Sequence, residues 1–245
     1  MIYNFAISDL KIRYRNSILG FFWTFLEPLL ILATLYIIFT NLFNSKIEHF
    51  PLYILVGIIM WNMFARGTQT GLGSILTRSS ILTQIYLPRE IPSLSSALTA
   101  LFMFCFEMMA FAVFLIAFQF IPPITALLLP FVVCLEFILI VGISLPLSVL
   151  NVRYRDIQFI WTVVLQLGFF LTPIFYKSDI LPSKIQDILY FSPMVRIIDM
   201  THDLVLYNTI PSSESILTCL AIVLAIFGTG YIVFKKLEPK IIEEL

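Results

Sequence analysis

Charged residues are scarce in this chain of 245 residues. Lysine, arginine, aspartate and glutamate together supply 12% of the sequence, whereas 60% of the residues are hydrophobic. A soluble globular domain is about a quarter charged and about half apolar. The composition therefore excludes an ordinary soluble domain and predicts a polytopic membrane protein. Apolar stretches occupy the whole length, so we expect a single transmembrane domain over residues 1–245.

Residue types that usually serve in catalysis or metal binding are also rare. The three cysteines, Cys105, Cys134 and Cys219, stand in apolar runs, where packed thiols are expected rather than a disulfide or a metal site. His202 lies near Asp199 and Asp203, which is the one grouping that resembles a metal or acid–base site. We expect it to be a surface-facing cluster in a loop. No catalytic residue, cofactor or metal is predicted.

Two sequence signals are missing. The chain has no G-x-x-x-x-G-K-[ST] loop of the kind that cradles nucleotide phosphates, so it is not expected to bind ATP itself. It also shows no evident cleavable signal, because no small-residue cleavage site follows the charged N-terminal segment. Nothing in the sequence indicates a nucleic-acid partner.

The first residues, 1–19, predict a cationic amphipathic helix. Apolar residues fall on one helical face and polar or basic residues on a neighbouring one: Tyr3, Ala6, Ile7, Leu10 and Tyr14 against Asn4, Ser8, Lys11 and Arg15. Asp9 stands four residues before Arg13, a spacing that allows an ion pair. Such a helix lies in the plane of a membrane surface, with its cations toward lipid phosphates.

Six apolar stretches can be drawn as helical spans, at about 1.5 Å per residue. They are residues 22–43, 52–71, 97–121, 124–150, 157–176 and 215–234. The second is the weakest, because Asn62, Arg66 and Gln69 form a polar stripe at helical spacing. A buried or re-entrant helix is the alternative there, but we favour a span whose cytoplasmic end faces protein or water.

Residues 177–213 are too polar and too interrupted by proline to cross a bilayer. They keep apolar clusters, so short re-entrant or interfacial helices are expected. The six-span arrangement places eleven lysines and arginines on one side and four on the other. Cytoplasmic loops are enriched in these residues, so both termini are predicted to be cytoplasmic.

Acidic residues inside apolar spans are candidates for function, because a charge at membrane depth is costly. Glu107 and Glu136 lie well inside spans, and Glu27 lies just before Pro28. A protonated or hydrogen-bonded structural role is an equally good interpretation. Aromatic residues crowd the start of the first span, at Phe21, Phe22, Trp23 and Phe25. Rings facing a passage would stack on sugars, whereas lipid contact and packing explain most aromatic residues.

Two short loops on the predicted cytoplasmic side have apolar and charged tips. Residues 78–92 read RSSILTQIYLPREIP, a helical stretch followed by a proline and the charged pair Arg89-Glu90. Residues 151–156 read NVRYRD. A short helix joined rigidly to two spans suits mechanical contact with a soluble partner, although an ordinary basic loop would have the same composition.

Five motifs in order resemble the permease subunits of ABC type-2 exporters, in particular those that export polysaccharides. They are DLKIRYRNSILGFFWTFLEPLL at 9–30, IYLPREIP at 85–92, NVRYRD at 151–156, LTPIFY at 171–176 and SPMVRIIDMTHDL at 192–204. The resemblance covers nearly the whole chain. It implies six spans, an interface helix, a coupling helix between spans two and three, and re-entrant helices before the last span.

The resemblance also implies partners and roles. It implies a homodimer whose interface forms a conduit in the plasma (inner) membrane for a lipid-linked glycan, driven by two ATP-binding ABC subunits. Contact with those subunits is expected from residues of the interface helix and the two loops: Lys11, Arg13, Arg15, Ile81, Leu82, Tyr86, Pro88, Arg89, Glu90, Arg155 and Asp156. Export of a drug or small lipid by the same fold is one alternative, and a membrane enzyme acting on lipid-linked sugars is another.

Overall fold

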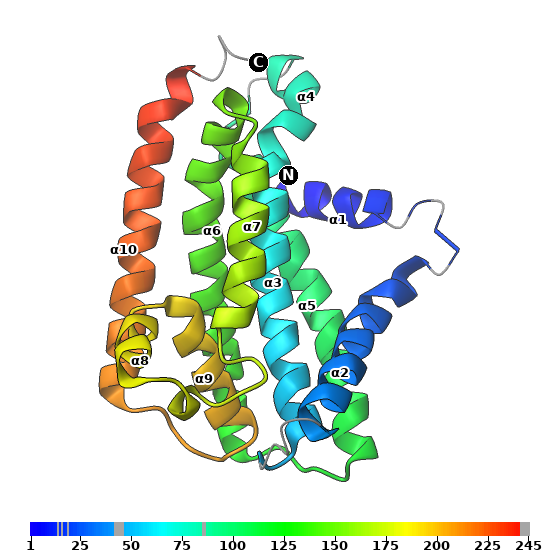
Figure 1. Cartoon of the computed structure of the whole chain (residues 1–245). Coiled ribbons are helices and arrows are strands. Elements are labelled where there is room, and N and C mark those ends of the chain that lie inside the picture. Colours follow the sequence, from blue (N-terminus) through cyan, green and yellow to red (C-terminus); the bar gives the residue numbers. More distant parts are fainter. Residues whose placement is uncertain (14, 16, 19, 42–46, 85–86, 241–245) are drawn as a thin grey trace.

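The described residues form a bundle of helices, and the axes of most of the long ones are nearly parallel or antiparallel (Figure 1). The structure is a computed structural model. It describes residues 1–13, 15, 17–18, 20–41, 47–84 and 87–240, without the side chains of residues 21, 40, 41, 83, 179 and 240. Every regular element in these ranges is helical, as predicted for a polytopic membrane protein.

Long helices form the bundle, and α3 (Phe50–Thr77) is the central one among them. The others are α2 (Trp23–Asn41), α5 (Ile91–Ala117), α6 (Leu129–Arg153), α7 (Ile157–Leu171) and α10 (Ser213–Leu237). Within α3, the side chains from Leu52 to Phe64 are all buried, and α2, α5, α6, α7 and α9 (Pro193–Val205) pack around it. A helix that is hydrophobic on all sides belongs in such a core position.

Within the described residues, four helical segments are long and apolar enough to cross a membrane: Phe50–Thr77, Glu90–Ala117, Ile124–Arg153 and Ser213–Leu237. They contain or overlap the expected spans 52–71, 97–121, 124–150 and 215–234. The other two expected spans correspond to shorter apolar helices, Trp23–Phe39 and Ile157–Leu171. Helix α7 ends before residue 176 because Pro173 follows Thr172, and a residue before proline avoids helical dihedrals.

Glycine allows two of the helices to touch. A Cβ atom on Gly230 of α10 would collide with the carbonyl oxygen of Gly142 in α6. A Cβ on Gly142 would in turn lie 2.7 Å from the Cα of Phe227. Small residues allow this close backbone approach between membrane helices, which packing forces then stabilise.

The remaining elements are short. Helix α1 (Ile2–Arg13) lies across the bundle and packs on α5, and α4 (Ser79–Gln84) lies at the same end of the bundle as the last turn of α10 (Figure 1). Helices α8 (Ser183–Tyr190) and α9 occupy the expected non-spanning segment 177–213. The 3₁₀ turns are η1 (Gly20–Phe22), η2 (Ile124–Leu128), η3 (Ser178–Ile180) and η4 (Glu238–Lys240). Helix α1 ends at Arg13, earlier than the expected helix over 1–19.

The cysteines are free thiols. Cys219 is buried, as expected for a packed thiol. The same expectation is wrong for Cys105 and Cys134, which are exposed on the chain surface. An apolar run does not reveal which side of a helix faces outward, so the sequence did not separate these three positions.

Candidate functional site

A groove with polar and aromatic walls lies between α2, α3 and α7. Its volume is about 530 Å³. The polar stripe of α3, Asn62, Arg66 and Gln69, lines one side, and Thr162 and Gln166 of α7 line another. The remaining lining residues are Glu27, Ile31, Trp61, Ala65, Leu165, Phe169 and Phe170. The groove thus combines an apolar and aromatic wall with several polar side chains along the bundle.

Arg66 links the groove to the bundle interior. Its side chain is 11% exposed, and its guanidinium forms an ion pair with the fully buried Glu107 of α5. The side chain of Glu27 in α2 is 51% exposed, and its carboxylate lies 3.9 Å from the same guanidinium. Two of the three acidic residues singled out in the sequence therefore share one arginine. Glu136 of α6 is fully buried elsewhere in the bundle.

Several lining side chains have unsatisfied polar atoms. Asn62 Nδ2, Arg66 Nη1 and Gln69 Oε1 are buried and have no hydrogen-bond partner among the described residues. Gln69 donates through Nε2 to Thr162 Oγ1 at 3.2 Å, which joins α3 to α7. Buried polar atoms in native proteins are usually hydrogen-bonded, so such atoms beside a groove indicate water or a ligand there.

The aromatic lining differs from the aromatic residues noted in the sequence. Trp61, Phe169 and Phe170 line the groove. Phe22 and Trp23 are exposed at the start of α2, with the Phe22 and Phe25 ring centroids 6.3 Å apart. The side chain of Phe21 lies outside the described part of the structure. Composition could not separate these groups, because both stand in aromatic-rich apolar sequence.

A second feature is the junction of α1 with the ends of α3 and α5. Arg78, which is buried, pairs with Asp9 of α1, donates to the Pro92 carbonyl oxygen at 3.3 Å and lies over the Phe5 ring at 5.1 Å. The Ala6 side chain is fully buried, and Thr99 Oγ1 donates to the Ala6 carbonyl oxygen at 3.4 Å. Helix α1 is thus fixed to the bundle, and the Asp9 carboxylate pairs with Arg78 at the end of α3.

The charged pair at 89–90 contacts the end of α10. Arg89 donates to the carbonyl oxygen of Glu238, and Glu90 forms an ion pair with Lys235. Lys235 also contacts the Glu238 carboxylate at 2.9 Å. These contacts, which we call the α10 clasp (Arg89, Glu90, Lys235 and Glu238), connect residues far apart in the sequence. No local pattern could have revealed them.

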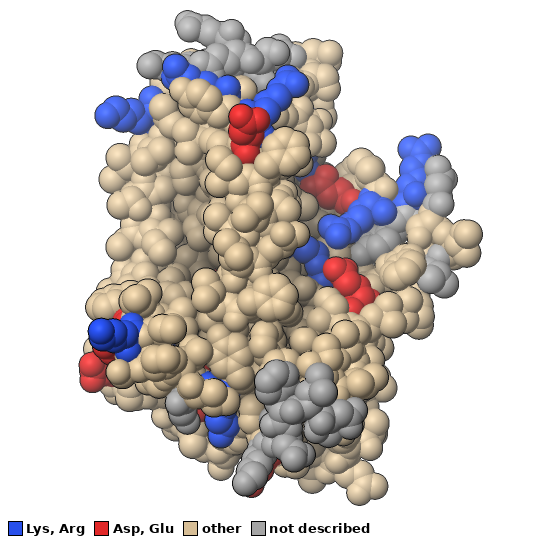
Figure 2. All heavy atoms as spheres, viewed as in Figure 1, with Lys and Arg blue, Asp and Glu red and all other residues tan. Residues whose placement is uncertain are grey.

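The other residues expected to meet a partner lie at or near the same end of the molecule, at the ends of α1 and α6, beside the clasp or on α4. Among those described, Leu82 is partly buried and the rest are exposed: Lys11, Arg13, Arg15, Ile81, Pro88, Arg155 and Asp156. Tyr86 lies outside the described residues. Figure 2 shows charged side chains gathered around α1 and the end with α4, whereas the described face over α6 and α7 carries few.

The grouping of His202 with Asp199 and Asp203 differs from the expected surface loop. All three residues are on helix α9, and His202 is only 2% exposed. Its ring stacks on the Tyr53 ring with centroids 3.6 Å apart. That expectation is wrong because α9 packs against α3, α6 and α10. Among the described residues, no group of three or more metal-ligating side chains is found.

These features define a polytopic membrane protein whose apolar helix bundle carries a groove lined by both polar and aromatic side chains. The sequence profile of the ABC-2 type transporter family matches residues 5–206. The chain therefore belongs to the ABC-2 type transporter family.

Curated relatives cover nearly the full chain. It is 28% identical over 239 residues to the O-antigen export system permease protein RfbA of Klebsiella pneumoniae, covering 97% of this chain and 92% of the relative. It is 28% identical over 243 residues to the protein of the same name from Myxococcus xanthus, with the same coverage of both chains. A second Klebsiella pneumoniae relative of that name is 29% identical over 240 residues.

Proposed function

We propose that this chain is the transmembrane subunit of an ATP-driven exporter that moves a lipid-linked polysaccharide from the cytoplasm to the outer side of the plasma (inner) membrane. The observation that carries the proposal is the end-to-end similarity to permeases named for O-antigen export. Family membership favours ATP hydrolysis on separate partner chains, and two copies of the partner are expected.

The groove supports a route for a hydrated polymer. A glycan carries many hydroxyl groups, which need hydrogen-bond partners inside an apolar membrane. Amide, hydroxyl and charged side chains of the groove supply both donors and acceptors, and Trp61, Phe169 and Phe170 supply ring faces. The groove is open on one side of a single chain, so we propose that a second copy closes it in a homodimer.

The apolar surface beside the groove supports this arrangement. Exposed apolar residues cover α7: Phe159, Ile160, Val163, Val164, Leu167, Phe170 and Leu171. A second copy would bury part of this surface, and lipid would cover the rest. In this proposal α2 and α7 cross the membrane with the four longer helices, which gives six spans and two cytoplasmic termini.

The end that carries α1, α4 and the α10 clasp is proposed to bind the partner ATPases. Closure of the ATPase dimer would push on α4 and α1. The Asp9–Arg78 contact would pass the push to α3 and α5, and the clasp would pass it to α10. Movement of α3 against α7 would then widen or narrow the groove.

Export in cells tests this proposal. Deletion of the gene should leave lipid-linked polymer on the cytoplasmic side, and the wild-type chain should restore surface polymer only with an ATPase partner able to hydrolyse ATP. Surface polymer that is unchanged by the deletion would contradict the proposed function.

A further inference from the structure

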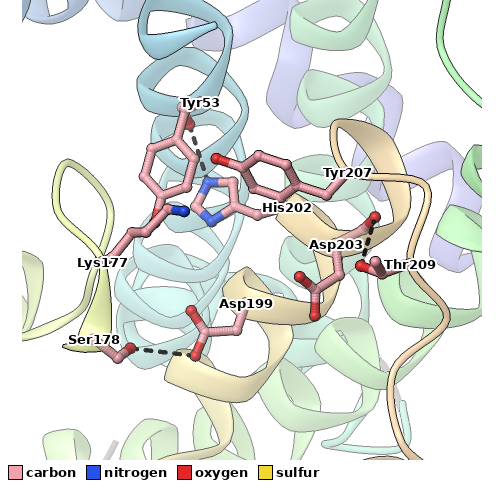
Figure 3. A pocket seen from close by; sticks show the side chains of 8 residues that line it. All are labelled: Tyr53, Lys177, Ser178, Asp199, His202, Asp203, Tyr207 and Thr209. Carbon is pink, nitrogen blue, oxygen red and sulfur yellow. Dashed lines mark hydrogen bonds between the residues drawn. The ribbon is translucent and has the colours of Figure 1, made fainter. Parts of the chain in front are cut away.

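A second cavity lies at the end of the bundle opposite α4 and the last turn of α10. It lies among the first turn of α3, the segment after α7, and α9 with the residues that follow it (Figure 3). Its volume is about 440 Å³. It is lined by Tyr53, Lys177, Ser178, Asp199, His202, Asp203, Tyr207 and Thr209. This cavity is separate from the groove, with no lining residue in common.

His202 presents an unused acceptor at this cavity. Its Nε2 lies 3.0 Å from the carbonyl oxygen of Tyr53. A carbonyl oxygen only accepts, so Nε2 carries the proton and Nδ1 of the neutral ring is a bare acceptor. Nδ1 is buried and has no partner among the described residues. Burial lowers the pKa of His202 to about 3, so the ring is neutral at physiological pH.

The other groups around the cavity combine acceptors with hydroxyl donors. Asp199 and Asp203 bring carboxylates, and Asp199 accepts from the Ser178 hydroxyl at 3.5 Å. The Tyr207 hydroxyl is buried and has no partner among the described residues. Figure 3 shows these side chains arranged around one space with the His202 ring. A ligand with several hydroxyl groups could satisfy both the histidine nitrogen and the tyrosine hydroxyl.

Charge narrows the class of ligand. Two carboxylates repel an anion such as a phosphate group. Lys177 lies over the Tyr207 ring at 5.1 Å and partly offsets the two carboxylates, and among the described residues no group of three or more His, Cys, Asp or Glu side chains is placed to hold a metal ion. A neutral ligand rich in hydroxyl groups fits this mixture best, because it can donate to the carboxylates and to Nδ1 while it accepts from the lysine.

We propose that this cavity binds a sugar unit. The further statement that this sugar belongs to a glycan leaving the groove at the outer side of the membrane rests on the proposed function. The binding site itself does not. A cavity beside the exit would hold successive units weakly and so hinder the polymer from sliding back.

Free sugars test the site directly. We would measure binding of hexoses, 6-deoxyhexoses and N-acetylhexosamines to the full-length chain in lipid nanodiscs by saturation-transfer NMR. Asp199→Asn and Asp203→Asn should each weaken binding about tenfold or more, because a hydrogen bond to a charged group is lost. Asp187→Asn on α8, exposed and outside the cavity, should bind as the wild type does. No binding by the wild type, or equal binding by all variants, would overturn the proposal.

A second readout needs no variant. A bound sugar should slow acylation of Lys177 by a water-soluble ester and leave acylation of Lys184 on α8 unchanged, as read by mass spectrometry. Equal rates with and without a saturating sugar would contradict the proposal. Neither assay includes a transport step, so a failure here would leave the proposed export function standing, and a failed export test would leave a positive binding result standing.

Discussion

Single residues place charge inside the bundle, and Arg66 is the main example. Its ion pair with Glu107 is buried, whereas Glu27 is half exposed at the edge of the groove. Removal of one partner from a buried pair leaves an uncompensated charge, which costs far more than loss of an exposed pair. The two carboxylates should therefore respond differently to the same substitution.

Glu107→Gln should destabilise the chain by about 3–5 kcal/mol, because the Arg66 guanidinium loses its buried counter-charge. Glu27→Gln is the matched control and should cost about 1 kcal/mol or less. Thermal unfolding in detergent measures both variants. Equal midpoints for them would show that Glu107 does not neutralise Arg66. The double variant Arg66→Met/Glu107→Leu should recover part of the lost stability.

His202 gives a pH dependence with a defined sign. Burial lowers its pKa in the folded state to about 3, against an ordinary value of 6.5 for a solvated histidine. The unfolded chain therefore binds more protons between these values, and stability falls as pH decreases through this window. Its contribution is fully present above pH 6.5.

The unfolding midpoint of the wild type should fall from pH 7 to pH 5 more steeply than that of His202→Gln, which has no titrating ring. The difference is at most about 1.4 kcal/mol per pH unit. Superimposable pH profiles for the two proteins would rule out a buried neutral histidine at this position.

At the scale of whole elements, the packing of α10 on α6 depends on a close contact between their backbones. Gly230 faces the Gly142 carbonyl oxygen, whereas a Cβ on Gly228, two residues away on the same helix, would meet nothing within 4 Å. Gly230→Leu should thus separate α10 from α6 and lower the unfolding midpoint and the yield of folded protein. Gly228→Leu should leave both near the wild-type values. Similar losses in the two variants would indicate a general intolerance of α10 instead.

The α10 clasp gives a second test at this scale. Glu90→Lys should lower export and the coupled ATP hydrolysis by the partner ATPase several-fold while membrane insertion is unchanged, because Lys235 then faces a like charge. The charge swap Glu90→Lys/Lys235→Glu restores an opposite-sign pair and should recover most of the activity. Wild-type export by Glu90→Lys alone would remove this loop from the coupling path, and a swap without recovery would remove the clasp.

The sequence predicted the helices better than their faces. Hydrophobic length identified the apolar segments, and Pro173 in the sequence already limits α7. The stripe of Asn62, Arg66 and Gln69 was visible as a helical repeat, and it proved to line the groove. Glu107 was also singled out, but its pairing with Arg66 was not predicted, because the side that α5 presents to α3 depends on packing. The same dependence buried His202, whose polar neighbours suggested a surface position.

Thr162 and Gln166 of α7 were missed, although their spacing of four residues places them on one helical face. The same helical spacing that marks the polar stripe of α3 also marks this pair in the sequence. The contact of Glu90 with Lys235 joins positions 145 residues apart, and a single sequence holds no local trace of it.

At the scale of the whole molecule, charge is concentrated around α1 and the end with α4, and the groove runs along the apolar bundle (Figure 2). The central claim is that this groove is the path of a polysaccharide. Bulky side chains in its wall should block a polymer, whereas equally bulky residues on the outer surface should not.

Export by Thr162→Trp and Gln166→Trp variants tests that claim most directly, with Leu217→Trp on α10, at a position 64% exposed and outside the groove lining, as the control. All three should insert and bind the partner ATPase. The account predicts that surface polymer is lost in the two groove variants and retained in the control. Full export by both groove variants would contradict it.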